Sequence, residues 1–353
     1  MIADSKSEKS ISNEYVQKFT YRQYTGHVES RLRRIWSLTW FELVSVWHKS
    51  TVGKVLLIII LALNLLVITF GALALNVQIN NLPESRQKEA ITTVLHAMVA
   101  NYLSSGITSD VSRIYPSDSN LISFRFPLGF LIIGLFAIAG SGLFADDRQG
   151  RIMELYMSKV QRWEYAAGKV GAIILYINIF ATVPLLIMSF LYIQALGADH
   201  LDYLYPFYFG VVLYGFLASL LLGLVILVLS ITVEKRMYAS LGFYLFFIIG
   251  SIFGAIVTEI DPSNEMLLLV SPSTFLELLG YVCLQDYSLF FQGDWIGWDE
   301  AIQEDIFAYT PLTLDDGTGL DYLHIFGVYF ALVFGLFLFL VFKLRRLTTE
   351  ALT

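Results

Sequence analysis

The residues best suited to specific chemistry lie in one stretch, 144–169, between two long apolar runs without charge. The candidate docking residues within it are Asp146, Asp147, Gly150, Glu154, Arg162, Trp163, Glu164 and Lys169. Arginine and aromatic side chains are the usual anchors of protein–protein interfaces. The stretch is therefore a candidate docking site for a protein partner, in which the two aspartates occupy the first turn of a helix that leaves the membrane. The alternative is an ordinary loop whose basic residues only set topology.

Motifs of ATP and metal chemistry are missing. The two Gly-Lys pairs, 53–54 and 168–169, carry His48 and Trp163 where the phosphate-binding loop G-x-x-x-x-G-K-[ST] needs its first glycine. The five histidines are scattered, without the spacing of a zinc site. Cys283 is the single cysteine, which excludes an intrachain disulfide framework. We therefore expect no catalytic residue, no metal and no cofactor in this chain.

The composition is that of an integral membrane protein. Hydrophobic residues make up 56% and charged residues 15% of the chain, whereas soluble domains carry about 25% charged residues. A transmembrane helix needs about 20 mostly apolar residues. Six runs fit, at 53–75, 127–144, 170–194, 206–231, 238–258 and 323–342. We predict an all-α membrane protein with six transmembrane helices, the third of them kinked at Asn178 and Pro184.

The interiors of these six runs contain no Asp, Glu, Lys or Arg. Ion-coupled transporters and proton pumps need such groups at the depth of the membrane centre, so their absence disfavours a self-powered secondary transporter. An intramembrane enzyme is disfavoured for the same reason. A channel stays open as an alternative, although no ring of pore charges supports it.

The N-terminal part divides into a polar cytoplasmic tail, 1–30, and an amphipathic segment, 31–52. Leu32, Trp36, Trp40, Leu43 and Trp47 recur at helical spacing and are flanked by Arg31, Arg33, Arg34 and Lys49. Tryptophans favour the headgroup level of a bilayer, and basic residues meet anionic lipid. We expect this helix to lie in the membrane interface. The alternative is a soluble amphipathic helix that packs on another domain.

Basic residues define the orientation. Nineteen Lys and Arg residues fall on the side of the N-terminus and four on the other, which places both termini and the stretch 144–169 in the cytoplasm of a multi-pass plasma-membrane protein. The two outer segments are then 76–126 and 259–322, the second with thirteen acidic residues and no Lys or Arg. We expect a helix over 91–102 to cap the outer face, and 265–284 to form a helix or re-entrant hairpin against the membrane.

Spacing in the candidate docking stretch resembles a family signature. Asp-x-x-x-Gly-x-x-x-Glu-Leu, followed by an arginine and a Gly-Lys pair, is similar to the element between spans two and three of ABC type 2 permeases. The matching positions are Asp146, Gly150, Glu154, Leu155, Arg162, Gly168 and Lys169. Residues 40–43 and 269–275 resemble two further family elements, and the resemblance covers about 31–346. Where the family carries Pro-hydrophobic-Ser-Arg, this chain reads Lys159-Val160-Gln161-Arg162.

The resemblance implies the permease subunit of an ABC transporter, a homodimer or heterodimer in membrane lipid that exports its substrate. A separate ABC ATPase, which holds the ATP and Mg²⁺, is expected to dock on 144–169. Glu42, Glu234, Lys235 and Arg236 are its expected secondary contacts. The alternative within this architecture is a mechanotransmission subunit that acts on an extracytoplasmic partner without moving a solute. No nucleic-acid partner is expected.

Overall fold

The structure is a computed structural model that describes residues 30–49, 51–80, 99, 102–103, 128–150, 153, 160–196, 204–260, 265–285 and 322–350. Every element within these ranges is a helix, which confirms the all-α prediction for them. The long helices are α3 (Thr51–Asn80), α5 (Leu128–Gln149), α9 (Leu204–Thr232), α10 (Arg236–Ile260) and α14 (Tyr322–Glu350). The N-terminal tail and most of the two outer segments, including most of the helix predicted over 91–102, lie outside the described residues.

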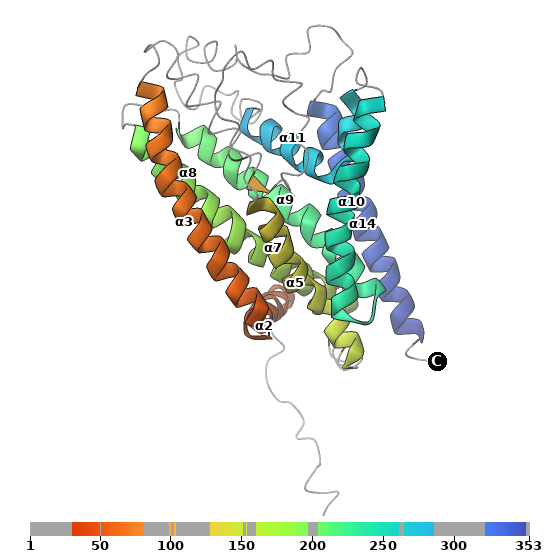
Figure 1. The fold of residues 1–353 in the computed structure, drawn as a ribbon. Helices are drawn as coiled ribbons and strands as arrows, with labels where there is room; N and C mark the ends of the chain where they lie inside the picture. The colour runs from red at the N-terminus through yellow and green to blue at the C-terminus, as the bar shows by residue number, and fades with distance from the viewer. Residues whose placement is uncertain are drawn as a thin grey trace, which may run out of the picture.

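Five helical segments of the described chain are long and apolar enough to cross a membrane: Gly129–Gln149, Arg162–Leu191, Phe207–Thr232, Arg236–Gly254 and Leu323–Leu347. A sixth is reached if Arg31–His48 and Thr51–Leu66 count as one span, although these two helices meet at a bend of 85°. The long helices form a bundle (Figure 1). Helix α2 (Arg31–Lys49) and the C-terminal end of α14 lie toward one end of it, and α11 (Pro272–Gln285) lies toward the other.

The third predicted span is interrupted by a π-helical turn. Helix α7 (Arg162–Ile177) continues through η2 (Asn178–Thr182) into α8 (Val183–Leu196). Asn178 Nδ2 donates to Ile174 O and to Ser219 Oγ, both at 2.8 Å, and Thr182 Oγ1 donates to Asn178 Oδ1 at 2.9 Å. The side chains of Asn178 and Thr182 thus supply hydrogen bonds where the regular i to i−4 backbone pattern of the α-helix gives way to the wider π-helical turn. Pro184 follows in the first turn of α8, a position that tolerates its missing N–H.

Helix α9 packs closely against its neighbours in the bundle because glycines leave room for the side chains that face them. A Cβ on Gly140 of α5 would lie 2.6 Å from Ile226 Cγ2 of α9, and a Cβ on Gly223 would lie 3.0 Å from Ile173 Cγ2 of α7. Small residues are the usual means by which membrane helices pack tightly. Helix α14 is attached to α9 by Tyr329, whose Oη donates to Leu217 O at 2.9 Å.

Residues 269–275, which contain Ser271 and Pro272 and resemble a family element, rest against α10. A short 3₁₀ helix, η4 (Glu265–Val270), leads into α11, and Ser271 Oγ accepts the backbone N–H of Thr274 at 3.3 Å. Ser251 and Ser273 share a hydrogen bond of 2.5 Å. Gly254 leaves room for Ser271, because a Cβ there would overlap it. The segment predicted as a helix or re-entrant hairpin is therefore a 3₁₀ turn followed by a buried helix.

Candidate functional site

The two aspartates of the candidate docking stretch end a helix instead of beginning one. Helix α5 runs without a break to Gln149, so Asp146 and Asp147 lie in its last turn, and Gly150 N donates to Asp146 O at 2.9 Å. The prediction of a new helix at this point was wrong. The buried residues Leu143, Phe144 and Ala145 lead directly into the aspartates. This sequence contains no proline or glycine that would end the helix before Asp146.

Lys169 is the centre of a buried ionic cluster that joins three helices. Its Nζ lies 2.6 Å from Asp147 Oδ2 of α5 and 2.7 Å from Glu42 Oε1 of α2. Tyr165 Oη donates to the same Asp147 oxygen at 2.6 Å, and the ammonium stands 5.3 Å from the centre of the Tyr165 ring. Lys169 is fully buried and both carboxylates nearly so. Buried charges persist only when they are paired and hydrogen-bonded, so this cluster fixes α2, α5 and α7 relative to one another.

A second ion pair fixes the start of α7. Arg34 of α2 donates from Nη2 to Glu164 Oε1 at 2.9 Å, and Glu164 Oε2 accepts the backbone N–H of Gln161 at 3.4 Å. Gln161 has the extended backbone of an N-cap residue, and the acidic Glu164 in the first turn suits the positive end of the helix. The sequence led us to place Arg34 among lipid headgroups; the structure pairs it with a buried carboxylate instead.

The Gly-Lys pair has two separate roles. Gly168 allows α2 to approach α7, because a Cβ there would lie 2.5 Å from Leu38 Cδ2. Gly171 does the same for Thr39, and Thr39 Oγ1 donates to Gly168 O at 3.3 Å. Close backbone contact of α2 with α7 thus places Glu42 within reach of Lys169. Gly150, the other glycine of the candidate docking stretch, lies exposed after α5.

The turn between α9 and α10 is attached to α5 by hydrogen bonds in both directions. Arg148 donates to Ile231 O at 2.8 Å and lies 3.6 Å from Glu234 Oε1, and Arg236 donates to Ile138 O at 2.8 Å. Arg236 is half-buried, whereas Glu234 and Lys235 are exposed. This turn and the end of α5 are therefore one connected unit.

Ser230 makes the same connection deeper in the bundle. Its Oγ accepts the backbone N–H groups of Phe144 and Ala145 at 3.0 and 3.1 Å and donates to Ser141 O at 2.7 Å. The Ser230 hydroxyl thus bonds to both N–H donors and a C=O acceptor of the α5 backbone. Nothing in the sequence marks a serine near the end of an apolar run as a hydrogen-bonding partner of another helix. Tyr165 and Arg148 likewise were not predicted as site residues.

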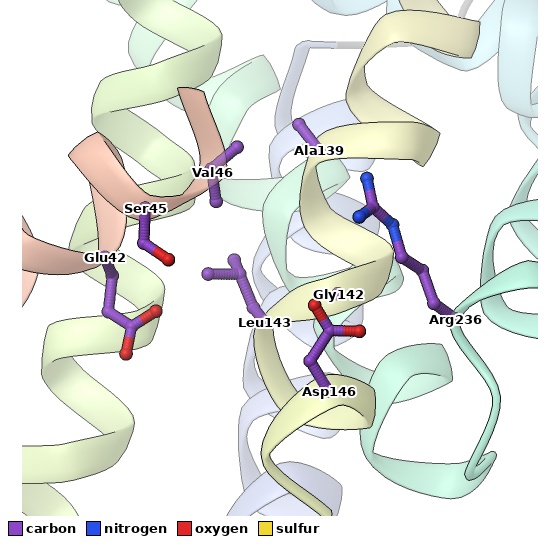
Figure 2. Close-up of a pocket in the computed structure, with 8 residues that line it drawn as sticks. All are labelled: Glu42, Ser45, Val46, Ala139, Gly142, Leu143, Asp146 and Arg236. Atoms are coloured by element: carbon purple, nitrogen blue, oxygen red, sulfur yellow. The ribbon is translucent and has the colours of Figure 1, made fainter. Parts of the chain in front are cut away.

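Figure 2 shows a small cleft between α2, α5 and α10. Glu42 points toward it from α2, Asp146 from α5 and Arg236 from the start of α10. A Cβ on Gly142 would lie 2.9 Å from Asp146 Oδ2 and 3.4 Å from Arg236 Cδ, so this glycine makes room for both. The cleft has space for about one water molecule, which is too little for a substrate. Within the ranges described, no group of His, Cys, Asp and Glu could hold a metal ion.

The remaining predicted residues separate by exposure. Arg162 and Trp163 begin α7 and are exposed, with 49% of Trp163 accessible. Trp163 Nε1 donates to Gln161 Oε1 at 2.6 Å, which orients the indole. Glu154 and Leu155 lie outside the described residues. The predicted site is thus divided into a buried ionic cluster and an exposed edge at the start of α7.

A comparison with protein families gives a match. The family model described as ABC-2 family transporter protein matches residues 47–291, a range that includes Asp147 and Lys169, begins after Glu42 and ends before α14. No curated protein matches the chain.

Proposed function

Because this chain belongs to the ABC-2 family of transporter proteins, we propose that it is an export permease whose exposed edge at Arg162 and Trp163 receives a separate ABC ATPase. The permease role follows from the family; export and the site of docking are the proposal. The observation that carries it is the position of Lys169, whose ion pairs connect the start of α7 to α2 and α5. ATP and Mg²⁺ would be held by the ATPase.

The proposed contact surface consists of the exposed residues at this end. Arg162 and Trp163 stand at the start of α7, and Glu234 and Lys235 stand on the α9–α10 turn. An exposed arginine beside an exposed tryptophan is the kind of anchor a partner pocket takes up. The buried members Glu42, Asp147, Glu164 and Lys169 would instead transmit the movement.

The proposed transmission follows the contacts. A displacement of the first turn of α7 would move α2 through the pairs Arg34–Glu164 and Lys169–Glu42. It would move α5 through Lys169–Asp147, and from there the α9–α10 turn through Arg148. Ion pairs buried at this depth are stiff connections, because breaking one leaves a buried charge unpaired.

We further propose six spans, cytoplasmic termini and assembly as a dimer. Supporting the orientation, Arg162, Lys235 and Arg345 are exposed and lie within two residues of the ends of candidate spans. The C-terminal end of α14 lies at the same end of the bundle as α2 (Figure 1). An excess of basic residues marks the cytoplasmic side. Counting α2 and α3 as one bent span gives the even number that puts both termini on one side.

Co-purification tests the docking proposal. The chain is expressed with the ABC ATPase of a neighbouring reading frame, and assembly and ATP turnover are measured for wild type, Arg162→Ala with Trp163→Ala, and the control Arg346→Ala on α14. We expect the double variant to weaken assembly about tenfold or more, since each interface anchor contributes more than about 1 kcal/mol. The control should match wild type. Wild-type assembly and turnover in the double variant would remove the exposed edge of α7 from the docking surface.

A further inference from the structure

The backbone hydrogen bonding of the third span changes in residues 178–184, which we call the joint. The N–H of Val183 donates to Asn178 O, five residues earlier, where a regular α-helix bonds four residues back. Pro184 comes next and has no N–H, and in a regular helix its ring would clash with the carbonyl of Phe180. The joint lies about 24 Å from the start of α7, at a rise of about 1.5 Å per residue. Regular backbone bonding is therefore interrupted near the middle of the span.

Side chains fix the joint on α9. Asn178 Nδ2 donates to Ser219 Oγ at 2.8 Å, and Ser219 is fully buried. One turn away on both helices, Thr182 lies against Gly215, where a Cβ would overlap the Thr182 hydroxyl. Thr182 Oγ1 in turn donates to Asn178 Oδ1 at 2.9 Å. The joint is thus held in place by side-chain contacts with α9, although its own backbone lacks the regular hydrogen bonds.

The helices before and after the joint are attached to different neighbours. Helix α7 is bound to α2 and α5 through the ion pairs of Lys169, and it approaches α2 closely at Gly168. Helix α8, on the other side of the joint, packs on α3. A force on the start of α7 therefore acts first on α2 and α5, whereas α3 holds α8 in place. The joint lies between these two attachments.

We propose that the third span bends at the joint, with the contact of Asn178 with Ser219 as the pivot, so that α7 changes its angle while α8 stays on α3. Prolines and π-helical turns are the usual sites of helix bending, and the joint contains both. The part that this bending plays in ATP-driven transport rests on the proposed function; the bending itself does not. The alternative is a rigid turn that does no more than accommodate Pro184.

Bending is measured as the width of spin-label distance distributions in the chain alone, reconstituted in nanodiscs. In a Cys283→Ala background, one label pair joins Ala167→Cys on α7 to Phe334→Cys on α14, and a second pair joins Ile187→Cys on α8 to the same position of α14. Phe334 and Ile187 are exposed and Ala167 is half-buried, so the labels have room.

Pro184→Ala should stiffen the span, because it restores a backbone donor and removes the clash of the ring. We expect this variant to narrow the α7–α14 distribution about twofold and to leave the α8–α14 distribution unchanged. Equal widths of the α7–α14 distribution in wild type and Pro184→Ala would overturn the proposal and leave a rigid turn.

The pivot is tested by removing its hydrogen bond to α9. Ser219→Ala takes away the acceptor of Asn178 Nδ2, so we expect the α7–α14 distribution to become about twofold wider. Ser189→Ala is the matched control and should keep the wild-type widths, because the Ser189 hydroxyl is equally buried but donates to Leu185 O within its own helix α8. If Ser219→Ala has the same widths as Ser189→Ala, the contact of Asn178 with Ser219 is not the pivot.

The role in transport is measured in the complex with the ATPase, with and without a non-hydrolysable ATP analogue. A bend of about 20° at the joint would move Ala167, about 16 Å away along the helix, by about 5 Å. We expect the analogue to shift the α7–α14 distance by this amount and not the α8–α14 distance, and Pro184→Ala to reduce the shift. Equal shifts of both pairs would overturn the proposal, because the span would then move as a rigid rod. If no ATPase assembles, the proposed function has failed, and the widths measured on the chain alone decide the bending.

Discussion

The ammonium of Lys169 lies 2.6 Å from the carboxylate of Asp147, although the two residues belong to different helices and to opposite ends of the most charged stretch in the middle of the chain. Glu42, more than a hundred positions earlier, lies 2.7 Å from the same nitrogen. A partner that displaces the exposed start of α7 must therefore move α2 and α5 with it. The predictions below test this connection and the packing that supports it.

Lys169→Met should destabilise the protein strongly. The substitution leaves the carboxylates of Glu42 and Asp147 buried without their cation, which typically costs about 3–5 kcal/mol. The measurement is the thermal unfolding of purified protein in detergent, followed by size-exclusion chromatography. Lys235→Met, at an exposed position of the α9–α10 turn, is the control. Adding Glu42→Gln and Asp147→Asn to Lys169→Met should restore much of the loss; a triple variant less stable than Lys169→Met would contradict the ion-pair explanation.

Gly168→Ala should separate α2 from α7. Its Cβ would lie 2.5 Å from Leu38 Cδ2, and overpacking of this kind costs about 1–3 kcal/mol. Leu38→Ala in the same chain should recover part of the stability, because it removes the overlapping atoms. Gly335→Ala on α14 is the matched control, since nothing lies within 4 Å of a Cβ there. The measurement is the thermal unfolding of wild type, Gly168→Ala, the double variant and Gly335→Ala. Equal losses of stability in Gly168→Ala and Gly335→Ala would contradict the close packing at Gly168.

Ser230→Ala should weaken the junction of α9 with α5. The hydroxyl accepts from Phe144 N and Ala145 N and donates to Ser141 O. Removing it leaves buried backbone groups without that partner, which costs about 1–3 kcal/mol. Thr232→Ala, which removes an exposed hydroxyl bonded within its own helix, should change stability by less than about 0.5 kcal/mol. If the Ser230→Ala protein is as stable as the Thr232→Ala protein, the backbone groups of α5 do not need the Ser230 hydroxyl as a hydrogen-bond partner.

Asn64 and Tyr102 should show energetic coupling. Asn64 is a polar residue in the apolar middle of α3, and its Nδ2 donates to Tyr102 Oη at 3.1 Å while both side chains are buried. Hydrogen bonds between buried polar groups in membrane proteins contribute about 0.6–2 kcal/mol. Unfolding of Asn64→Leu, Tyr102→Phe and the double variant gives the coupling energy. Strictly additive losses would mean that the pair does not stabilise the protein.

The charged stretch shows what spacing could and could not predict. Asp147, Glu164 and Lys169 were identified as candidates because charge is conspicuous between apolar runs. Their burial was not foreseen, since a residue's neighbours from a distant helix cannot be read from local spacing. Arg162 and Trp163 carry the same local signal, yet they are exposed. The difference arises because α2 covers one side of α7 and leaves the other open.

Composition and the length of the apolar runs by themselves determined the all-helical membrane class, since crossing hydrocarbon requires about 20 apolar residues with an internally hydrogen-bonded backbone. Motif spacing pointed to the family. Tertiary structure alone decided that Glu42, Asp147 and Lys169 meet at one point, because the contact depends on Gly168 and Gly171 admitting α2. It also decided that Ser230 completes the hydrogen bonding of α5. Both are interactions between helices, and their partners are chosen by packing in three dimensions.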